Sequence, residues 1–307
     1  MQKVFLSAVQ AYYQLFGARA AVEAAVEAER ASLESLKAAT ARYDAGTATP
    51  ADKLQAQTAH SQAILNRIQA EGNAKNAEGA LANAMGLDAN RPLSYLAPAL
   101  KVPDEQFDRN LDQLINDARR RRPDLAAAEA QVKSAEASAQ AVRAAGMPTL
   151  SLSANAGYTN SSLSDPFHSQ AIGISISIPI FTGFNSTYQI RAAQAKVDSQ
   201  AAQRDSVNLQ VALDVWQAFQ NLSTGVQAAR SSSDLLASAT ASERVALGRY
   251  RAGAGSIIDL VTAQSALASA RQQNIQALYS LSVFKAALAQ ALGRIDWDVL
   301  NESGSRP

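Results

Sequence analysis

The stretch "RYRAGAGSIIDLVTAQ", Arg249 to Gln264, decides the fold because it repeats an earlier stretch, "RYDAGTATPADKLQAQ", Arg42 to Gln57. Tyr250 follows Tyr43 by 207 positions (250 − 43 = 207), and the same offset carries "LANAMG" at 81–86 onto "LAQALG" at 288–293 without a gap. A gapless match at both the middle and the end of a segment indicates internal duplication. A chance likeness between two Ala-rich helices does not account for the shared Arg-Tyr, Gly and Asp.

Long helices are predicted on both sides of each repeated stretch. Residues 4–43 and 50–85 keep small or apolar side chains at spacings of three and four, with Gly46 and Pro50 between them. Residues 188–250 and 256–292 form the corresponding pair around Gly253. Each pair is therefore a helical hairpin with a glycine-containing tip. A hairpin rich in small residues permits close helix approach but cannot bury both of its faces alone, so we expect an extended coiled assembly with other subunits as packing partners.

The remaining segments divide the chain around these hairpins. We expect a first repeat at 1–86, a Pro-rich connector with a short helix (Phe107–Arg120) at 87–120, a second repeat at 121–293 and a tail at 294–307. The second repeat begins with a further helix, which Pro123 opens. The charge run from Arg119 to Arg122 indicates a solvated helix end rather than a binding site.

Between that helix and the second hairpin, residues 148–181 change to a period of two. Alternation of aliphatic residues with Ser, Thr, Asn and Gly predicts a β-hairpin with a loop near 160–169, and Pro179 suits a strand end. In a soluble sheet the aliphatic face would cover a core. Strands of about ten residues also cross a bilayer when tilted, with the aliphatic face on lipid. The candidate lipid-facing residues are Leu150, Leu152, Ile172, Ile174, Ile176 and Ile178.

Composition excludes several classes of protein. The 28 Lys and Arg nearly balance the 27 Asp and Glu, which argues against a nucleic-acid binder with a broad basic surface. The absence of Cys excludes disulfides and thiolate metal sites. The sequence shows no nucleophile–His–acid set, phosphate loop or metal-ligand cluster. We therefore expect no enzyme activity, no catalytic residues, no metal and no cofactor.

These features together resemble one family, the TolC-like outer-membrane efflux proteins. The residues that carry the resemblance are the two RY-x-x-G-x-x-x-x-x-D tips (Arg42–Asp52 and Arg249–Asp259), the run "RRPDLAAAEAQVKSAEASAQAVRAAGMPTLSLSANAGY" (Arg121–Tyr158) and "ISIPIFTG" (Ile176–Gly183). The second run is similar to the channels of multidrug and heavy-metal efflux pumps.

The resemblance implies a mainly α fold with a small β part. The long helical hairpins would form a coiled tunnel in the periplasm, and the β-hairpin would contribute to a trimeric transmembrane β-barrel in the outer membrane. The implied function is passive export of small molecules. The implied partners are two further copies in a homotrimer, a periplasmic adaptor protein, an inner-membrane pump and outer-membrane lipid.

The resemblance also places the aperture of the tunnel at the two hairpin tips. Asp52 and Tyr250 would form a polar contact pair, and Asp259 would supply a constricting ring of carboxylates, which attracts cations. Gly255 and Thr262 stand where some members have an Arg and a second Asp. Asp52 and Asp259 also suit the first turn of a helix, and this interpretation is compatible with the aperture. The candidates for adaptor contact are Arg42, Tyr43, Gly46, Arg249, Gly253 and Gly255.

The first repeat starts differently from the second. The first repeat lacks a counterpart of the segment that carries the strands, and the sequence shows no signal peptide and no Cys for lipid attachment. We therefore expect an N-terminally truncated member. The alternatives to a channel component are a soluble coiled-coil scaffold and a nonfunctional remnant of a channel.

Overall fold

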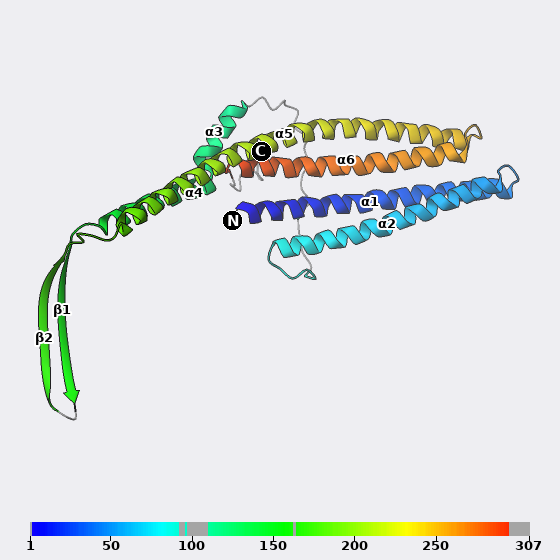
Figure 1. The fold of residues 1–307 in the computed structure, drawn as a ribbon. Helices are drawn as coiled ribbons and strands as arrows, with labels where there is room; N and C mark the ends of the chain where they lie inside the picture. The colour runs from blue at the N-terminus through cyan, green and yellow to red at the C-terminus, as the bar shows by residue number, and fades with distance from the viewer. Residues whose placement is uncertain (1, 92–95, 97–109, 162–163, 295–307) are drawn as a thin grey trace, which may run out of the picture. The chain divides into compact units, whose positions relative to one another are not determined.

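The computed structural model describes residues 2–91, 96, 110–161 and 164–294 and shows two compact units (Figure 1). The first unit contains Met1–Arg121 with Leu213–Pro307, and the second contains Arg122–Ala212. The described residues form six helices and one two-stranded antiparallel sheet, which confirms the mainly α fold with a small β part. The first hairpin and most of the second lie in the first unit, whereas the start of the second hairpin, up to Ala212, lies in the second unit, so the boundary between the repeats is not the boundary between the units.

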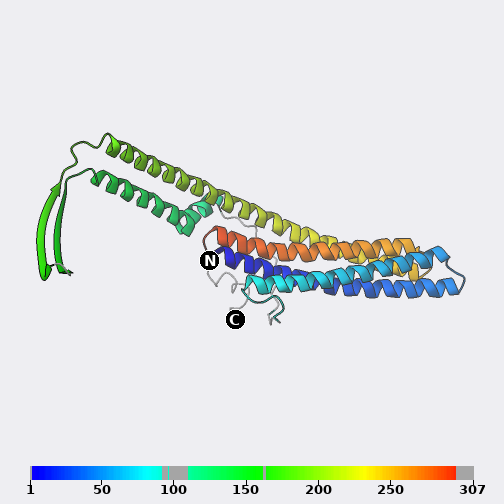
Figure 2. The ribbon, with the colours of Figure 1, turned by 60° about the horizontal axis from the view of Figure 1, so that its bottom comes forward.

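The first unit is built from the two hairpins. Figures 1 and 2 show α1 running beside α2 and α6, and all three pairs among these helices are in contact. The predicted short helix starts later than expected, at Leu111. Residues 92–95, 97–109 and 295–307, which include most of the predicted connector and tail, lie outside the described residues. The helices are α1 (Gln2–Asp44), α2 (Pro50–Ala84), α3 (Leu111–Arg121), the C-terminal part of α5 (Asn185–Arg251) and α6 (Ile257–Ala291).

The backbone forms the same turn at the two hairpin tips. Gly46 and Gly253, which are 207 positions apart, have φ angles of +69° and +79° at the two hairpin tips. This left-handed conformation strains residues with a Cβ, so glycine is the residue that ends each helix here. The Gly46 N–H donates to the Tyr43 carbonyl over 2.9 Å, and the Gly253 N–H donates to the Tyr250 carbonyl over 3.0 Å. The two tips are therefore one turn built twice.

Packing within the hairpins also follows the repeat. Leu15 in α1 and Leu222 in α5 occupy equivalent positions and are 0% and 1% exposed. Small residues bring the helices close together, as expected. A Cβ added to Gly225 of α5 would lie 2.7 Å from the Phe284 ring of α6, so that ring packs directly against the α5 backbone.

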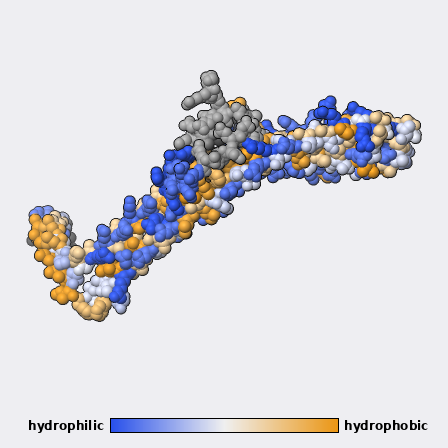
Figure 3. Space-filling model, turned by 90° about the horizontal axis from the view of Figure 1, so that it is seen from above, coloured by the Kyte–Doolittle hydropathy of each residue, from blue (hydrophilic) through white to orange (hydrophobic). Residues whose placement is uncertain are grey.

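The second unit contains α4 (Pro123–Ala144), the strands β1 (Thr149–Ser161) and β2 (Ser164–Ser177), and the N-terminal part of α5. In the sheet, Leu150 pairs with Ile176 and Leu152 pairs with Ile174 on one face. These four side chains are 68–73% exposed. On the other face, the Ser151 and Ser175 hydroxyl oxygens lie 2.7 Å apart. Figure 3 shows strong hydrophobic colour over this β-hairpin.

The strand bounds correct two details of the sequence analysis. The predicted loop near 160–169 is wrong, because β2 already begins at Ser164 and the ladder includes Tyr158 paired with His168. Polar side chains suggested a loop, but the Tyr158 and His168 rings contact each other, with centroids 4.9 Å apart, and the backbone pairing continues past them. Ile178 lies just beyond the end of β2, because the next residue, Pro179, has no N–H to donate to a ladder.

Among the helices that the structure describes, none combines the length and the apolar character needed to cross a membrane.

Candidate functional site at the hairpin tips

The two hairpin tips pack on each other around a small apolar cluster, which we call the tip core. Its members come from four helices, and each is at most 4% exposed. Tyr250 is the largest of them. Alanines at two of the five positions let the helices approach closely enough to enclose the tyrosine ring. The tip core consists of Ala39 (α1), Ala56 (α2), Tyr250 (α5), Ile257 and Leu260 (α6).

Arg42 links the first hairpin to the second. Its Nη2 donates to the Tyr250 carbonyl over 2.5 Å and to the Arg251 carbonyl over 3.3 Å. Its guanidinium carbon also lies 4.4 Å from the centroid of the Tyr250 ring. The last carbonyls of a helix lack intrahelical partners and carry partial negative charge, so a cation is favourable there. A side chain of α1 thus caps the C-terminus of α5.

A polar contact extends this link one step along the helices. The Gln264 amide nitrogen of α6 donates to the Ser35 hydroxyl of α1 over 3.0 Å. The Ser35 hydroxyl in turn donates to the Ala31 carbonyl over 3.1 Å. Ser35 is only 4% exposed, so this bond satisfies polar groups that would otherwise be buried without partners.

Asp52 and Asp259 each complete a capping box at the start of a helix. The Asp52 N–H donates to the Thr49 hydroxyl over 3.2 Å, while the Thr49 N–H donates to the Asp52 carboxylate over 2.9 Å. Ser256 and Asp259 repeat the arrangement, with corresponding distances of 3.1 and 3.4 Å. The capping roles of Thr49 and Ser256 were not predicted, although a Thr or Ser three residues before an acidic residue indicates a capping box. Hydrogen bonds from the Thr49 backbone and hydroxyl lower the pKa of Asp52.

The predicted contact between Asp52 and Tyr250 stays a prediction. The Tyr250 hydroxyl is buried and has no hydrogen-bond partner within the described part of the chain. Burial raises the pKa of Tyr250, the Arg42 charge opposes that shift and the Asp52 charge adds to it. Asp52 is therefore near enough to act on the tyrosine electrostatically, while its carboxylate oxygen bonds to Thr49.

The other predicted tip residues are mostly exposed. Asp259 and Thr262 lie on the exposed side of the first turns of α6. Tyr43 is 39% exposed, and its ring centroid lies 5.1 Å from the Lys53 ammonium. The Arg249 Nη2 donates over 3.4 Å to the carbonyl of Ala254 in its own tip.

Gly255 is closely packed. A Cβ at this position would lie 3.1 Å from both the Arg249 Cβ and the Tyr250 backbone nitrogen. An arginine here, as in some members of the family that the sequence resembles, would require the end of α5 to move. This packing explains why glycine suits the position in this chain.

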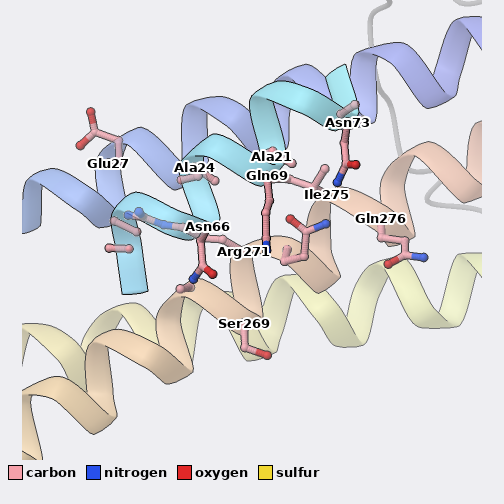
Figure 4. A pocket seen from close by; sticks show the side chains of 18 of the residues that line it. Ala21, Ala24, Glu27, Asn66, Gln69, Asn73, Ser269, Arg271, Ile275 and Gln276 are labelled. Carbon is pink, nitrogen blue, oxygen red and sulfur yellow. The ribbon is translucent and has the colours of Figure 1, made fainter. Parts of the chain in front are cut away.

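A cavity of about 1660 Å³ lies between α1, α2 and α6 in the first unit (Figure 4). Alanines 21 and 24 form part of its α1 side, and Figure 4 shows Gln69 extending from α2 toward α6. Amide groups recur along its wall. Neutral amides bond water and polar solutes without selecting for charge. The amides include Gln10, Gln14, Gln55, Gln62, Asn66, Gln69, Asn73, Asn76, Gln264, Gln272 and Gln276.

One Ser–His contact also lies between α1 and α2. The Ser32 hydroxyl oxygen is 3.2 Å from His60 Nδ1 and 2.8 Å from the Glu29 carbonyl, to which it donates. The hydroxyl proton is therefore held by the backbone, and Ser32 is 7% exposed, which does not suit an attacking nucleophile. Within the described residues, no three His, Cys, Asp or Glu side chains gather as a metal site.

Comparisons with known proteins agree with this architecture. The chain is 34% identical over 300 residues to the protein CyaE of Bordetella pertussis and 22% identical over 327 residues to the outer membrane protein TolC of Escherichia coli. These alignments cover 96% and 100% of the chain but 63% and 65% of the relatives, so the chain spans less than two thirds of their length.

A solved structure shares the fold. The outer membrane protein VceC of Vibrio cholerae superposes with a TM-score of 0.81 at 21% identity, over 95% of this chain and 70% of that one. A sequence model of outer membrane efflux proteins matches residues 1–87 and 114–294. This match takes in both helical hairpins, their tips and the β-hairpin. The chain belongs to the outer membrane efflux protein family.

Proposed function

We propose that this chain is part of an outer-membrane channel-tunnel, a passive duct through which small molecules leave the cell. Energy for export would come from an inner-membrane pump joined through a periplasmic adaptor. Three copies would form the duct, with the strands in the outer membrane and the helical hairpins in the periplasm. Family membership supports this function over a soluble coiled-coil scaffold.

The observation that carries the proposal is the exposed aliphatic face of the β-hairpin. Ile172, Ile174 and Ile176 are 82%, 73% and 68% exposed, and Leu150 and Leu152 are each 72% exposed. So much apolar area on one side of a thin sheet costs free energy in water. In a bilayer the same face meets lipid, and the face with Ser151 and Ser175 meets water in the lumen.

At the other functional region, the hairpin tips would form the inner aperture. Asp259 is exposed beside the tip, so copies arranged around an axis would bring several Asp259 carboxylates together and attract cations. Thr262 lies on the next turn of α6. Asp52 and Tyr250 are proposed as a contact pair of the assembled aperture. The exposed residues Tyr43 and Arg249 are available for protein contacts at the tips.

Two lysine substitutions on neighbouring residues test the membrane face. Ile174→Lys places a charge on the aliphatic face, where it should cost about 2–4 kcal/mol near the bilayer midplane. Ser175→Lys places the same charge on the opposite face, toward the lumen. In the full-length protein, we expect the first change to remove trimers from the outer-membrane fraction and the second to retain them with altered ion selectivity in planar bilayers. Equal tolerance of both changes would contradict the membrane assignment.

A further inference from the structure

The cavity between α1, α2 and α6 carries a continuous row of amide side chains on its α2 side. Five of them follow one another at spacings of four, three, four and three residues. This spacing places all five on one face of the helix, so we call the row the amide stripe. Figure 4 shows three of its members directed from α2 toward α6. The amide stripe consists of Gln62, Asn66, Gln69, Asn73 and Asn76.

The duplication of the hairpins provides an internal comparison for the amide stripe. The offset of 207 carries the five positions onto α6, where only two of them hold an amide. The stripe is therefore particular to the first hairpin, and the helix packing that both hairpins share does not require it. The equivalent residues of α6 are Ser269, Gln273, Gln276, Ser280 and Val283.

Most of the stripe is available to a ligand. Gln62 and Asn66 bond to each other, with the Gln62 Nε2 donating to the Asn66 Oδ1 over 2.9 Å. The side chains of Gln69, Asn73 and Asn76 are exposed and have no hydrogen-bond partner within the described part of the chain. An amide offers N–H donors beside a carbonyl acceptor, and a hydroxyl both donates and accepts. Two neighbouring hydroxyls of a ligand can therefore bond one amide at both of its polar atoms.

Charged groups are few around the cavity. Among the described residues that line it, the charged side chains are Glu27, Glu243 and Arg271, which gives a net charge of −1 (1 − 2 = −1). An ionic ligand would give up hydration on entry and find little opposite charge in return. The wall therefore favours a ligand that is polar and uncharged.

Two tyrosine rings lie at the Asn76 end of the stripe. Tyr13 of α1 and Tyr279 of α6 both line the cavity and are half-buried. Residues 11–18 of α1 pack on residues 77–81 of α2, and the Tyr279 ring lies against the α1 backbone in the same segment. Aromatic faces pack well on flat C–H surfaces. A sugar ring presents C–H groups on its faces and hydroxyls at its edge, so rings beside amides match both of its parts.

The size of the cavity indicates a ligand of several units. Its volume of about 1660 Å³ exceeds the roughly 300–1,000 Å³ that drug-sized molecules occupy. The fourteen residues from Gln62 to Asn76 span about 21 Å of helix. A chain molecule that repeats the same hydroxyl pattern along its length would use the whole stripe.

We propose that this cavity binds an uncharged oligosaccharide. The stripe amides bond its hydroxyls, and Tyr13 and Tyr279 pack against the face of a sugar ring. The binding rests on the cavity alone, whereas its use as a site on the export path rests on the proposed function. A polypeptide also carries amide groups, but its charged side chains find few partners on this wall. Repeated hydroxyls without charge suit the wall better.

Ligand-observed saturation-transfer NMR tests the site in the full-length protein, in a detergent without a sugar headgroup. Maltohexaose should receive saturation from the protein. Combined Gln69→Ala, Asn73→Ala and Asn76→Ala should weaken its affinity at least about tenfold, because several hydrogen bonds are lost. Gln57→Ala with Gln273→Ala removes exposed amides outside the cavity and should leave the affinity unchanged. All five are helical positions where alanine is favourable, so the variants should fold.

Two further probes test the class of ligand. An anionic hexamer of galacturonate and a neutral Gly–Ser peptide of similar length should each bind at least about tenfold more weakly than maltohexaose. Equal binding of the anionic chain would show that charge is not excluded, and equal binding of the peptide would assign the cavity to polypeptides. Either result would overturn the proposal. Unchanged maltohexaose affinity in the triple variant would overturn the site.

Planar bilayers separate this inference from the proposed function. Maltohexaose should interrupt the ion current through the full-length protein, and the interruptions should be shorter in the triple variant. A conducting channel that neither binds maltohexaose nor is interrupted by it would overturn the inference and leave the channel intact. Stripe-dependent binding by a protein that does not conduct would overturn the channel and leave the binding site.

Discussion

The Arg42 guanidinium reaches across from the first hairpin and donates to the Tyr250 carbonyl oxygen over 2.5 Å while it lies over the Tyr250 ring. One side chain thus caps a helix of the second repeat and covers the largest member of the tip core. The two tips are consequently coupled, because moving either hairpin at this end breaks both interactions. A gate built from these tips would open by moving them together or by releasing Arg42.

Replacement of Arg42 should therefore loosen the tips. We expect Arg42→Ala to lower the free energy of unfolding of the tip region by about 1 kcal/mol, since a charged donor and a cation–π contact are lost at a partly exposed site. Hydrogen exchange at the amides of residues 250–256 should speed up accordingly. Arg42→Lys keeps the charge but loses the planar guanidinium. Exchange at these amides should therefore be faster than in the unchanged protein and slower than in Arg42→Ala. Unchanged exchange in Arg42→Ala would show that the link contributes nothing.

This link also marks the limit of what the sequence could predict. The hairpins, their glycine tips and the strand pair followed from local periodicity and from turn residues such as Gly46 and Gly253. The contact between Arg42 and Tyr250 joins residues 208 positions apart and depends on how two helices pack, which no local pattern specifies. The full length of β2 was missed because its first residues are polar and resemble a loop.

The capping box of α2 should make the first tip sensitive to acid. Bonds from Thr49 lower the folded-state pKa of Asp52, so its carboxylate stabilises the tip above the unfolded-state pKa of about 4. That stability is lost as pH falls through the lower, folded-state pKa. In Asp52→Asn, the exchange rates of residues 47–53, corrected for intrinsic pH dependence, should lose this step, which lies below about pH 4.

Thr49→Ala is the matched control for this prediction. It removes the hydroxyl bond but keeps the backbone N–H of residue 49, whose bond is the larger cause of the lowered pKa, so the acid-dependent step should become smaller without disappearing. A full step in Asp52→Asn would assign the acid sensitivity to another group.

Alanine in place of a tip glycine should lower stability, whereas alanine in place of a glycine within a helix should raise it. Gly46→Ala forces a Cβ into the left-handed region, where φ is +69°, and should destabilise the protein by about 1 kcal/mol. A Cβ added to Gly72 within α2 would meet open space, with no neighbouring side chain within 4 Å, so Gly72→Ala should stabilise by up to about 1 kcal/mol through helix propensity. Chemical denaturation measures both. Effects of the same sign would show that φ at the tip is not the controlling factor.

Asp259 should control cation passage if the tips form the aperture. We expect Asp259→Ala in the full-length protein to raise single-channel conductance and to weaken block by multivalent cations, because a ring of carboxylates is removed. Asp259 also completes a capping box, so the effect of losing the cap must be distinguished from the effect of losing the carboxylate. Ser256→Ala removes the cap and keeps the carboxylate. Equal conductance changes in both variants would assign the effect to the cap and remove Asp259 from the constriction.

Tyr250 offers a test that separates its ring from its hydroxyl. The ring fills the tip core and lies beneath Arg42, so Tyr250→Ala should cost about 3 kcal/mol of stability through the cavity it leaves. The hydroxyl is buried without a hydrogen-bond partner in the described part of the chain, and such burial is unfavourable. Tyr250→Phe keeps the ring and removes this group, so stability should be unchanged or higher. If Tyr250→Phe instead costs more than about 1 kcal/mol, the hydroxyl has a partner in solution. Combining Tyr250→Phe with Asp52→Asn then tests Asp52 as that partner. If Asp52 is the partner, Tyr250→Phe should cost less stability in the Asp52→Asn background than alone.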